Sequence, residues 1–207
     1  MKKSHSLLLS LLLSLGVIAA VNTQAAVITF DDLPATELDA VPENYQGFNW
    51  GDSFFTNVAY IHKNTIPDSG YATGVVSGEY AAFNNFSTTS TIKTTDGGLF
   101  DFNGAYFTSA WKDNTHLTVT GFLNNAALFT QTVIINTSAA QWFDFNFTGI
   151  NSLQLNVWNY TPNDGNDFYV MDNFTVNEAI AVSESSSIAL LLLGIAGILF
   201  GRKFKHV

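Results

Sequence analysis

Apolar and polar side chains alternate in short segments along most of the chain, from residue 27 to residue 176. The clearest case is the segment 141–147, in which three phenylalanines alternate with Trp142, Asp144 and Asn146. Successive side chains of a β-strand point to opposite faces of a sheet, so this period predicts strands with one buried face. The same pattern predicts strands at Val27–Phe30, Gln46–Trp50, Phe54–Ile61, Glu79–Phe86, Thr89–Thr94, Phe100–Trp111, His116–Leu123, Ala127–Ile135, Gln141–Phe147, Ser152–Trp158 and Asp167–Val176.

The predicted strands are separated by residues that favour turns. Asp96-Gly97-Gly98 and Asn163-Asp164-Gly165-Asn166 are two examples, because Gly and Asn tolerate positive φ angles. No helical period is evident between residues 27 and 178. Many short strands in one domain of about 150 residues predict an all-β fold of two packed antiparallel sheets, a β-sandwich or jelly roll.

The amino-terminal segment has a different pattern. Lys2 and Lys3 precede an apolar run from Leu7 to Ala20, and small residues follow at Ala25 and Ala26. A basic start, a short apolar run and a small-residue cleavage site are typical of a secretory signal peptide, which we expect at residues 1–26. The alternative is a first membrane helix, which the shortness of the run disfavours.

The carboxyl-terminal segment predicts a membrane helix with a basic end. A linker at 179–187 leads into an apolar run from Ile188 to Phe200, and the basic residues Arg202, Lys203 and Lys205 follow. Thirteen apolar residues span roughly 20 Å of helix, less than the roughly 30 Å of a bilayer core. The segment 188–207 therefore predicts a short membrane helix whose basic end stays cytoplasmic.

This terminus resembles the PEP-CTERM sorting signal of bacterial exported proteins. Ser183, Glu184 and Ser185 occupy the position of its Pro-Glu-Pro motif, with the glutamate kept and serine at both proline positions. The resemblance implies an exosortase-type membrane protease as partner, transient residence in the inner membrane and cleavage near Glu184. It also implies release to the cell surface or the extracellular matrix, as in a biofilm. The alternative is a plain C-terminal anchor.

Charge and composition exclude some function classes. The segment 27–182 carries 16 acidic residues and three lysines, a net charge of −13, and the whole chain has no cysteine. An acidic surface repels nucleic acid and anionic lipid, so no nucleic-acid partner is expected. The absence of cysteine excludes a disulfide scaffold. The charge suits cation binding or simple solubility.

A carboxylate on an apolar strand face suggests a metal site. In the last predicted strand Asp172 shares its register with Phe174, so it is expected to point inward, and Asp32 shares a face with apolar residues of the first strand. Buried carboxylates need partners, and this part of the chain has no arginine. A structural Ca²⁺ held by Asp31 or Asp32 with Asp172 is one possibility. The other is that these residues cap strand ends and accept backbone N–H bonds.

Outward aromatic residues beside polar ones suggest sugar recognition. A pyranose has an apolar face that stacks on an aromatic ring and a rim of hydroxyls that bind polar groups. Trp111 beside Lys112 and Asp113 fits this description. The candidate ligand-binding residues on strands are Trp142, Asp144, Gln154, Asn156 and Trp158.

A second resemblance supports a binding role. The segments Ile28–Pro34, Tyr45–Trp50 and Tyr169–Phe174 are similar to β-sandwich bodies common among PEP-CTERM proteins and to carbohydrate-binding jelly rolls. In the latter the first and last strands share a structural calcium. The resemblance implies a binding or matrix role and possible attachment to extracellular polysaccharide.

Enzyme motifs are absent from the sequence. There is no His-Glu-x-x-His helix, no Gly-x-Ser-x-Gly elbow and no Gly-rich phosphate loop. We therefore expect a non-enzymatic exported protein that is structural or binds glycan. The alternative is a secreted hydrolase of matrix polysaccharide, which would need two carboxylates about 5–10 Å apart in a cleft.

Overall fold

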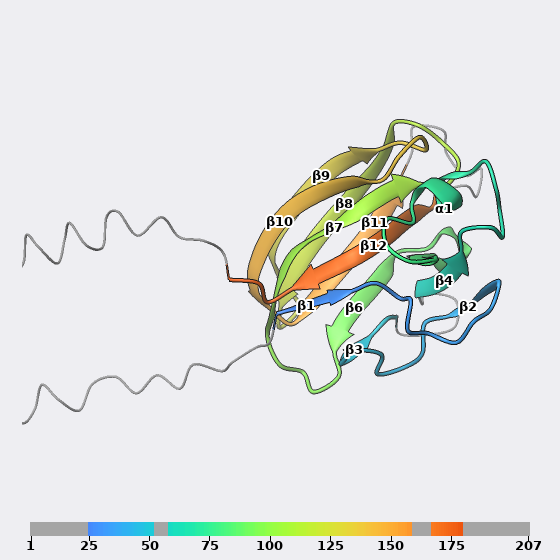
Figure 1. The fold of residues 1–207 in the computed structure, drawn as a ribbon. Helices are drawn as coiled ribbons and strands as arrows, with labels where there is room; N and C mark the ends of the chain where they lie inside the picture. The colour runs from blue at the N-terminus through green and yellow to red at the C-terminus, as the bar shows by residue number, and fades with distance from the viewer. Residues whose placement is uncertain (1–24, 52–57, 159–166, 180–207) are drawn as a thin grey trace, which may run out of the picture.

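The computed structural model describes residues 25–51, 58–158 and 167–179, and these residues form two facing sheets (Figure 1). The elements are β1 (Ala26–Ile28), β2 (Leu38–Ala40), β3 (Phe48–Asn49), β4 (Val58–His62), α1 (Gly70–Thr73), β5 (Tyr80–Asn84), the 3-10 turn η1 (Asn85–Ser87), β6 (Ser90–Thr94), β7 (Phe100–Ser109), β8 (Thr115–Leu123), β9 (Ala126–Ile135), β10 (Gln141–Ile150), β11 (Ser152–Trp158) and β12 (Tyr169–Val176).

Both sheets are antiparallel throughout. The seven-stranded sheet has the order β10-β7-β12-β5-β4-β2, and β1 also pairs with β12. The five-stranded sheet has the order β3-β6-β11-β8-β9. The predicted all-β sandwich is confirmed. Its first and last strands, β1 and β12, are neighbours.

The strand register separates the two ends of the sandwich. Ala26 lies opposite Val176, and Val176 lies opposite Phe102 near the start of β7. Tyr169, at the start of β12, lies opposite Ser109 at the end of β7. The first and last described strands therefore leave the sandwich at one end, whereas the turn after Ser109 lies at the other.

Aromatic side chains fill the space between the sheets. Phe102 stacks on Phe145 and on Phe174, with ring centroids 5.3 and 4.8 Å apart. Leu153 and Leu155 of β11 are fully buried opposite them, while Asn156 between Leu155 and Val157 is exposed. The alternation of apolar and polar residues in β10 and β11 therefore predicts their buried faces correctly. Apolar side chains occupy the buried face because removing them from water stabilises the fold.

The predicted face of the last strand is wrong over half its length. β12 takes one residue more than β7 between Asp172 and Thr175, and Asn173 has a φ of 52°. This β-bulge reverses the side-chain alternation. Phe174 therefore packs in the core between the sheets, whereas Val170 packs in a separate cluster and does not share its face. Asp172 is fully buried, as expected, but in the layer of Val170.

That separate cluster covers the outer side of the seven-stranded sheet. Tyr71 of α1 packs edge to face on Phe83 of β5, with ring centroids 5.2 Å apart. Ala59, Ile61 and Val170 complete the cluster with other buried residues. The helix α1 and its flanking loops therefore cover this part of the outer face, against β4, β5 and the end of β7 (Figure 1).

Two short elements, β2 and α1, were not expected from the sequence. They have three and four residues, too few to show a period. Within the described ranges no helix has the length and apolar character needed to cross a bilayer. The predicted signal peptide lies outside the described residues except for Ala25 and Ala26, the last two residues of that prediction. The predicted sorting motif Ser183-Glu184-Ser185, the apolar run and the basic residues Arg202, Lys203 and Lys205 lie outside them entirely.

Candidate functional site

The outward aromatic residues predicted to bind ligand do not form one site. Trp142 and Asp144 lie on β10 of the seven-stranded sheet, whereas Trp158 and Asn156 lie on β11 of the five-stranded sheet. All four are exposed. Because each pair faces away from the core of its own sheet, the two pairs lie on opposite outer faces of the sandwich. Gln154, partly exposed, belongs to the second face.

On the seven-stranded sheet, Trp142 lies across the backbone of β7. A Cβ added to Gly104 would meet the six-membered ring of the indole, so the missing side chain makes room for it. The indole N–H donates to the Asp144 carboxylate at 2.7 Å, and Tyr106 packs edge to face at 5.4 Å. The result is an indole fixed in position and 36% exposed.

On the five-stranded sheet, Trp158 stacks on His116. Their ring centroids are 4.3 Å apart, with an interplanar angle of 18°, and the indole N–H donates to the Thr118 hydroxyl at 3.2 Å. The Asn156 side chain accepts a hydrogen bond from the Thr89 hydroxyl at 2.9 Å. These polar groups are therefore engaged within the sheet.

The third outward tryptophan, Trp111, borders a hollow at the end of the sandwich opposite the start of β1 and the end of β12. The hollow has a volume of about 400 Å³, within the range of small-molecule sites. It is lined by Asp68, Ser69, Thr73, Ala110, Trp111 and Thr137. The Trp111 side chain, 45% exposed, packs edge to face on Tyr71 at 5.5 Å.

Three loops meet to build this hollow. The N–H of Gly70 in α1 donates to the carbonyl of Ala110 at 2.9 Å, and the hydroxyl of Thr73 donates to the carbonyl of Thr137 at 2.6 Å. A Cβ on Gly70 would overlap the carbonyl of Ser109, so only glycine lets α1 lie this close to the end of β7. The hollow is thus held by backbone contacts.

Asp113 fixes the third loop. Its Oδ1 accepts the backbone N–H and the hydroxyl of Thr137, each at 2.8 Å. These two donors hold the pKa of Asp113 below its usual value, with the backbone N–H as the larger cause. Asp113 therefore positions Thr137 at the hollow, and Asp68 supplies the carboxylate that lines it.

Asp172, one of the carboxylates predicted to bind a metal, accepts hydrogen bonds from backbone N–H groups. Oδ2 of Asp172 accepts the N–H groups of Val76 and Ser77 at 2.7 and 2.8 Å. Its Oδ1 accepts the N–H of Asn173 at 2.7 Å. Burial raises the pKa of Asp172 to about 6, and these N–H bonds oppose the rise.

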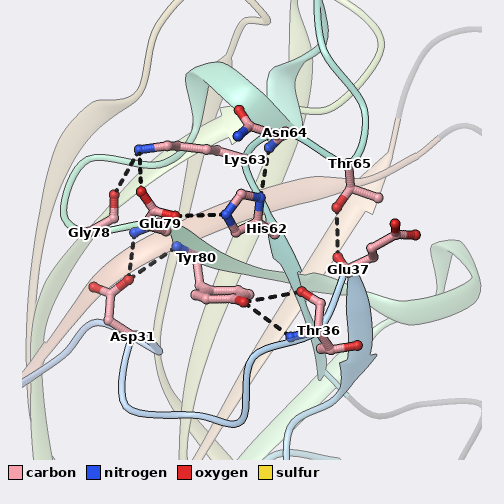
Figure 2. Close-up of polar contacts among 10 residues, drawn as sticks. All are labelled: Asp31, Thr36, Glu37, His62, Lys63, Asn64, Thr65, Gly78, Glu79 and Tyr80. Carbon is pink, nitrogen blue, oxygen red and sulfur yellow. Dashed lines mark hydrogen bonds and ion pairs between the residues drawn. The ribbon is translucent and has the colours of Figure 1, made fainter.

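Asp31 makes a matching contact further along the same segment (Figure 2). Its Oδ1 accepts the N–H groups of Glu79 and Tyr80 at 2.7 and 3.1 Å. The Glu79 side chain turns away to His62 and Lys63, at 2.8 and 3.2 Å. Hydrogen bonding to His62 is the largest cause that lowers the pKa of Glu79.

Asp32 points elsewhere. Its two oxygens accept hydrogen bonds from the Tyr45 hydroxyl and from the side-chain amide of Gln46. Among the described residues there is no group of three or more His, Cys, Asp or Glu side chains suited to a metal ion. The backbone-capping role given as the alternative accounts for Asp31 and Asp172, and a structural Ca²⁺ stays a prediction.

No protein-family model and no curated protein matches this sequence. Among solved structures, the CBM51 domain from Clostridium perfringens GH95 in complex with methyl-galactose is similar over 73% of this chain and 100% of its own, with 11% identity and a TM-score of 0.37. The CBM22-1-CBM22-2 tandem domain of Paenibacillus barcinonensis Xyn10C is similar over 77% of this chain and 46% of its own, with 13% identity and a TM-score of 0.38.

TmCBM61 in complex with β-1,4-galactotriose is similar over 67% of this chain and 95% of its own. The identity is 12% and the TM-score is 0.33. These names are those of carbohydrate-binding modules. Residue roles in the present chain follow from its own side chains, as described above.

Proposed function

We propose that this protein is a non-enzymatic glycan-binding module of the cell surface or extracellular matrix, and that a sugar unit occupies the hollow beside Trp111. The observation that carries the proposal is the composition of that hollow. An indole 45% exposed stands beside the Asp68 carboxylate and the hydroxyl-bearing residues Thr73 and Thr137. An aromatic ring next to hydrogen-bonding groups matches the apolar face and hydroxyl rim of a pyranose.

Delivery to the surface is part of the same proposal. The predicted signal peptide at 1–26 would export the chain. The sorting signal around Glu184 would bring it to an exosortase-type protease. Intact-mass measurement of protein released from the producing cells tests this: loss of everything beyond about Glu184 supports processing, and recovery of only the full-length, membrane-held chain supports a plain anchor.

The binding site is tested by three matched tryptophan variants of the full chain. Trp111→Ala should weaken binding to an immobilised polysaccharide at least tenfold, which corresponds to about 1.4 kcal/mol. Trp142→Ala and Trp158→Ala serve as controls because they remove the same ring from the two sheet faces. Circular dichroism checks that each variant keeps the fold.

The controls also decide between sites. Loss of binding only in Trp142→Ala would move the site to the seven-stranded sheet, beside Asp144. Failure to bind any matrix polysaccharide, including that of the source cells, would contradict glycan binding and leave a structural role. Release of new reducing ends that stops in Asp68→Asn would instead support the hydrolase alternative.

A further inference from the structure

The strand β9 forms an open edge of the five-stranded sheet. Its backbone pairs with β8 alone, without interruption from Phe129 to Ile135. A side chain also crosses to the other sheet, where the amide of Gln131 donates to the carbonyl of Asp144 on β10 at 3.5 Å. An edge strand of this kind presents a row of N–H and C=O groups that another strand can pair with. Ile134 and Leu128 add apolar side chains that are 49% and 48% exposed.

The other edges of the two sheets differ from β9. β3 has two residues and β2 has three, too few for extended pairing. β10 is as long as β9, but its register with β7 shifts twice and it carries Asp144. Short length, bulges and charge are the usual means by which proteins block pairing at an edge. Among the described strands β9 is the long edge that lacks a charge of its own.

Charge favours contact at this edge between two copies of the chain. From Asn114 to Phe143 the sequence contains no Asp, Glu, Lys or Arg, although the segment 27–182 carries a net charge of −13. None of the strands of the five-stranded sheet contains an Asp or Glu, and Lys93 on β6 is the charged residue within them. Two copies can therefore approach through β9 without bringing carboxylates of the five-stranded sheet together.

We propose that β9 pairs antiparallel with β9 of a second copy, so that the five-stranded sheets of the two copies become one continuous sheet. A two-fold axis makes such a contact self-complementary. With the axis at Thr132, Ile134 of each copy lies opposite Thr130 of the other on the outer face. Residues directly opposite in an antiparallel pair have Cα atoms about 4.5–5.5 Å apart.

The absence of cysteine permits a direct test on the full chain. With the axis at Thr132, Thr132→Cys places the two thiols opposite each other, at a Cα distance that a disulfide allows. Thr130→Cys and Ile134→Cys would instead link two copies only if the axis lay at residue 130 or 134. Thr91→Cys on β6 is the matched control, because it lies on the same sheet but on the opposite side from β9. We expect a disulfide-linked dimer on mild oxidation for at least one β9 variant and none for Thr91→Cys. Equal cross-linking of all four variants, or of none, would overturn the proposal.

A second pair of variants measures the association itself. Thr132→Lys places two positive charges opposite each other across the axis, which opposes pairing. Thr91→Lys makes the same change of charge on the same sheet, away from β9. Light scattering of the full chain in detergent should show the dissociation constant raised at least tenfold by Thr132→Lys and unchanged by Thr91→Lys. A wild-type chain that stays monomeric at high concentration, or that cross-links only to other proteins, would contradict self-pairing.

Discussion

Asp31 and Asp172 hold the two ends of one five-residue segment, Val76–Tyr80, through its backbone N–H groups. The two carboxylates come from opposite ends of the chain and lie near each other because β1 pairs with β12. Their proximity is also seen in the pKa of Asp172, which the charge of Asp31 raises further. The segment Val76–Tyr80, which leads from α1 into β5, is therefore held in place by the two aspartates.

The pH dependence of stability should reveal Asp172. Its pKa in the folded chain is raised from 3.8 to about 6, chiefly by burial. Between these values the folded state keeps a proton that the unfolded chain has lost, so the free energy of unfolding falls as pH rises. A shift of this size is worth about 3 kcal/mol. Urea melts from pH 4 to pH 7 should show this slope relative to Asp172→Asn; parallel curves for the two proteins would contradict it.

Gly78→Ala tests the contact with Asp31. Gly78 has a φ of +56°, and a Cβ there would meet the Asp31 carboxylate. The matched control is Gly97→Ala, at φ +73° with nothing within 4 Å. Both substitutions place a non-glycine residue at positive φ, which destabilises the fold by roughly 1 kcal/mol. We expect Gly78→Ala to cost about 1–3 kcal/mol more, because the added Cβ overlaps the Asp31 carboxylate, which must move and give up its hydrogen bonds to the N–H groups of Glu79 and Tyr80. Equal unfolding midpoints would show that Asp31 is dispensable.

A structural Ca²⁺ at Asp31 and Asp172 predicts the opposite pH dependence of stability. A Ca²⁺ at 100 times its dissociation constant would add about 2.7 kcal/mol to the folded state. Chelation should then lower the melting temperature by roughly 5–10 °C, and Asp172→Asn should reduce that effect. A bound cation would also lower the pKa of Asp172 and reverse the slope described above. A melting curve that chelation leaves unmoved means that backbone donors are the partners of both carboxylates.

Gly70→Ala tests how the hollow is built. Its Cβ would overlap the carbonyl of Ser109, so α1 must move away from the end of β7. We expect loss of polysaccharide binding together with a loss of stability of about 1–3 kcal/mol, the usual cost of overpacking. Thr73→Val offers a milder change, because it keeps the shape of the side chain and removes its hydroxyl. That hydroxyl donates to the carbonyl of Thr137 at 2.6 Å and to that of Ser69 at 3.5 Å. Binding that survives both substitutions would place the ligand elsewhere.

Period-2 alternation was sufficient to predict most strands and their buried faces, since burial repeats locally along each strand. It could not predict the extra residue near Asn173, because a bulge there depends on pairing with β7. It also could not show that β10 and β11, separated only by Asn151, belong to different sheets. For this reason Trp142 and Trp158, read from neighbouring segments, lie on opposite faces.

The candidate site was predictable only in part. Trp111 beside polar residues was recognised as a possible sugar platform, but its partners Asp68 and Thr73 come from a loop about forty residues earlier in the sequence. A pattern within one short segment cannot show which distant segments it meets in the folded chain. Gly70 was the available signal, since a glycine at the start of a short helix can mark close backbone approach.

The antiparallel pairing of Ala26 with Val176 also fixes how the molecule would stand on a surface. A tether attached beyond the last strand pulls at the end opposite Trp111. β7, with ten residues, spans about 33 Å between those ends. In a copy held by the predicted C-terminal tether, the hollow would lie about 3 nm from the point where the tether joins the sandwich, at the end left free to meet polymers.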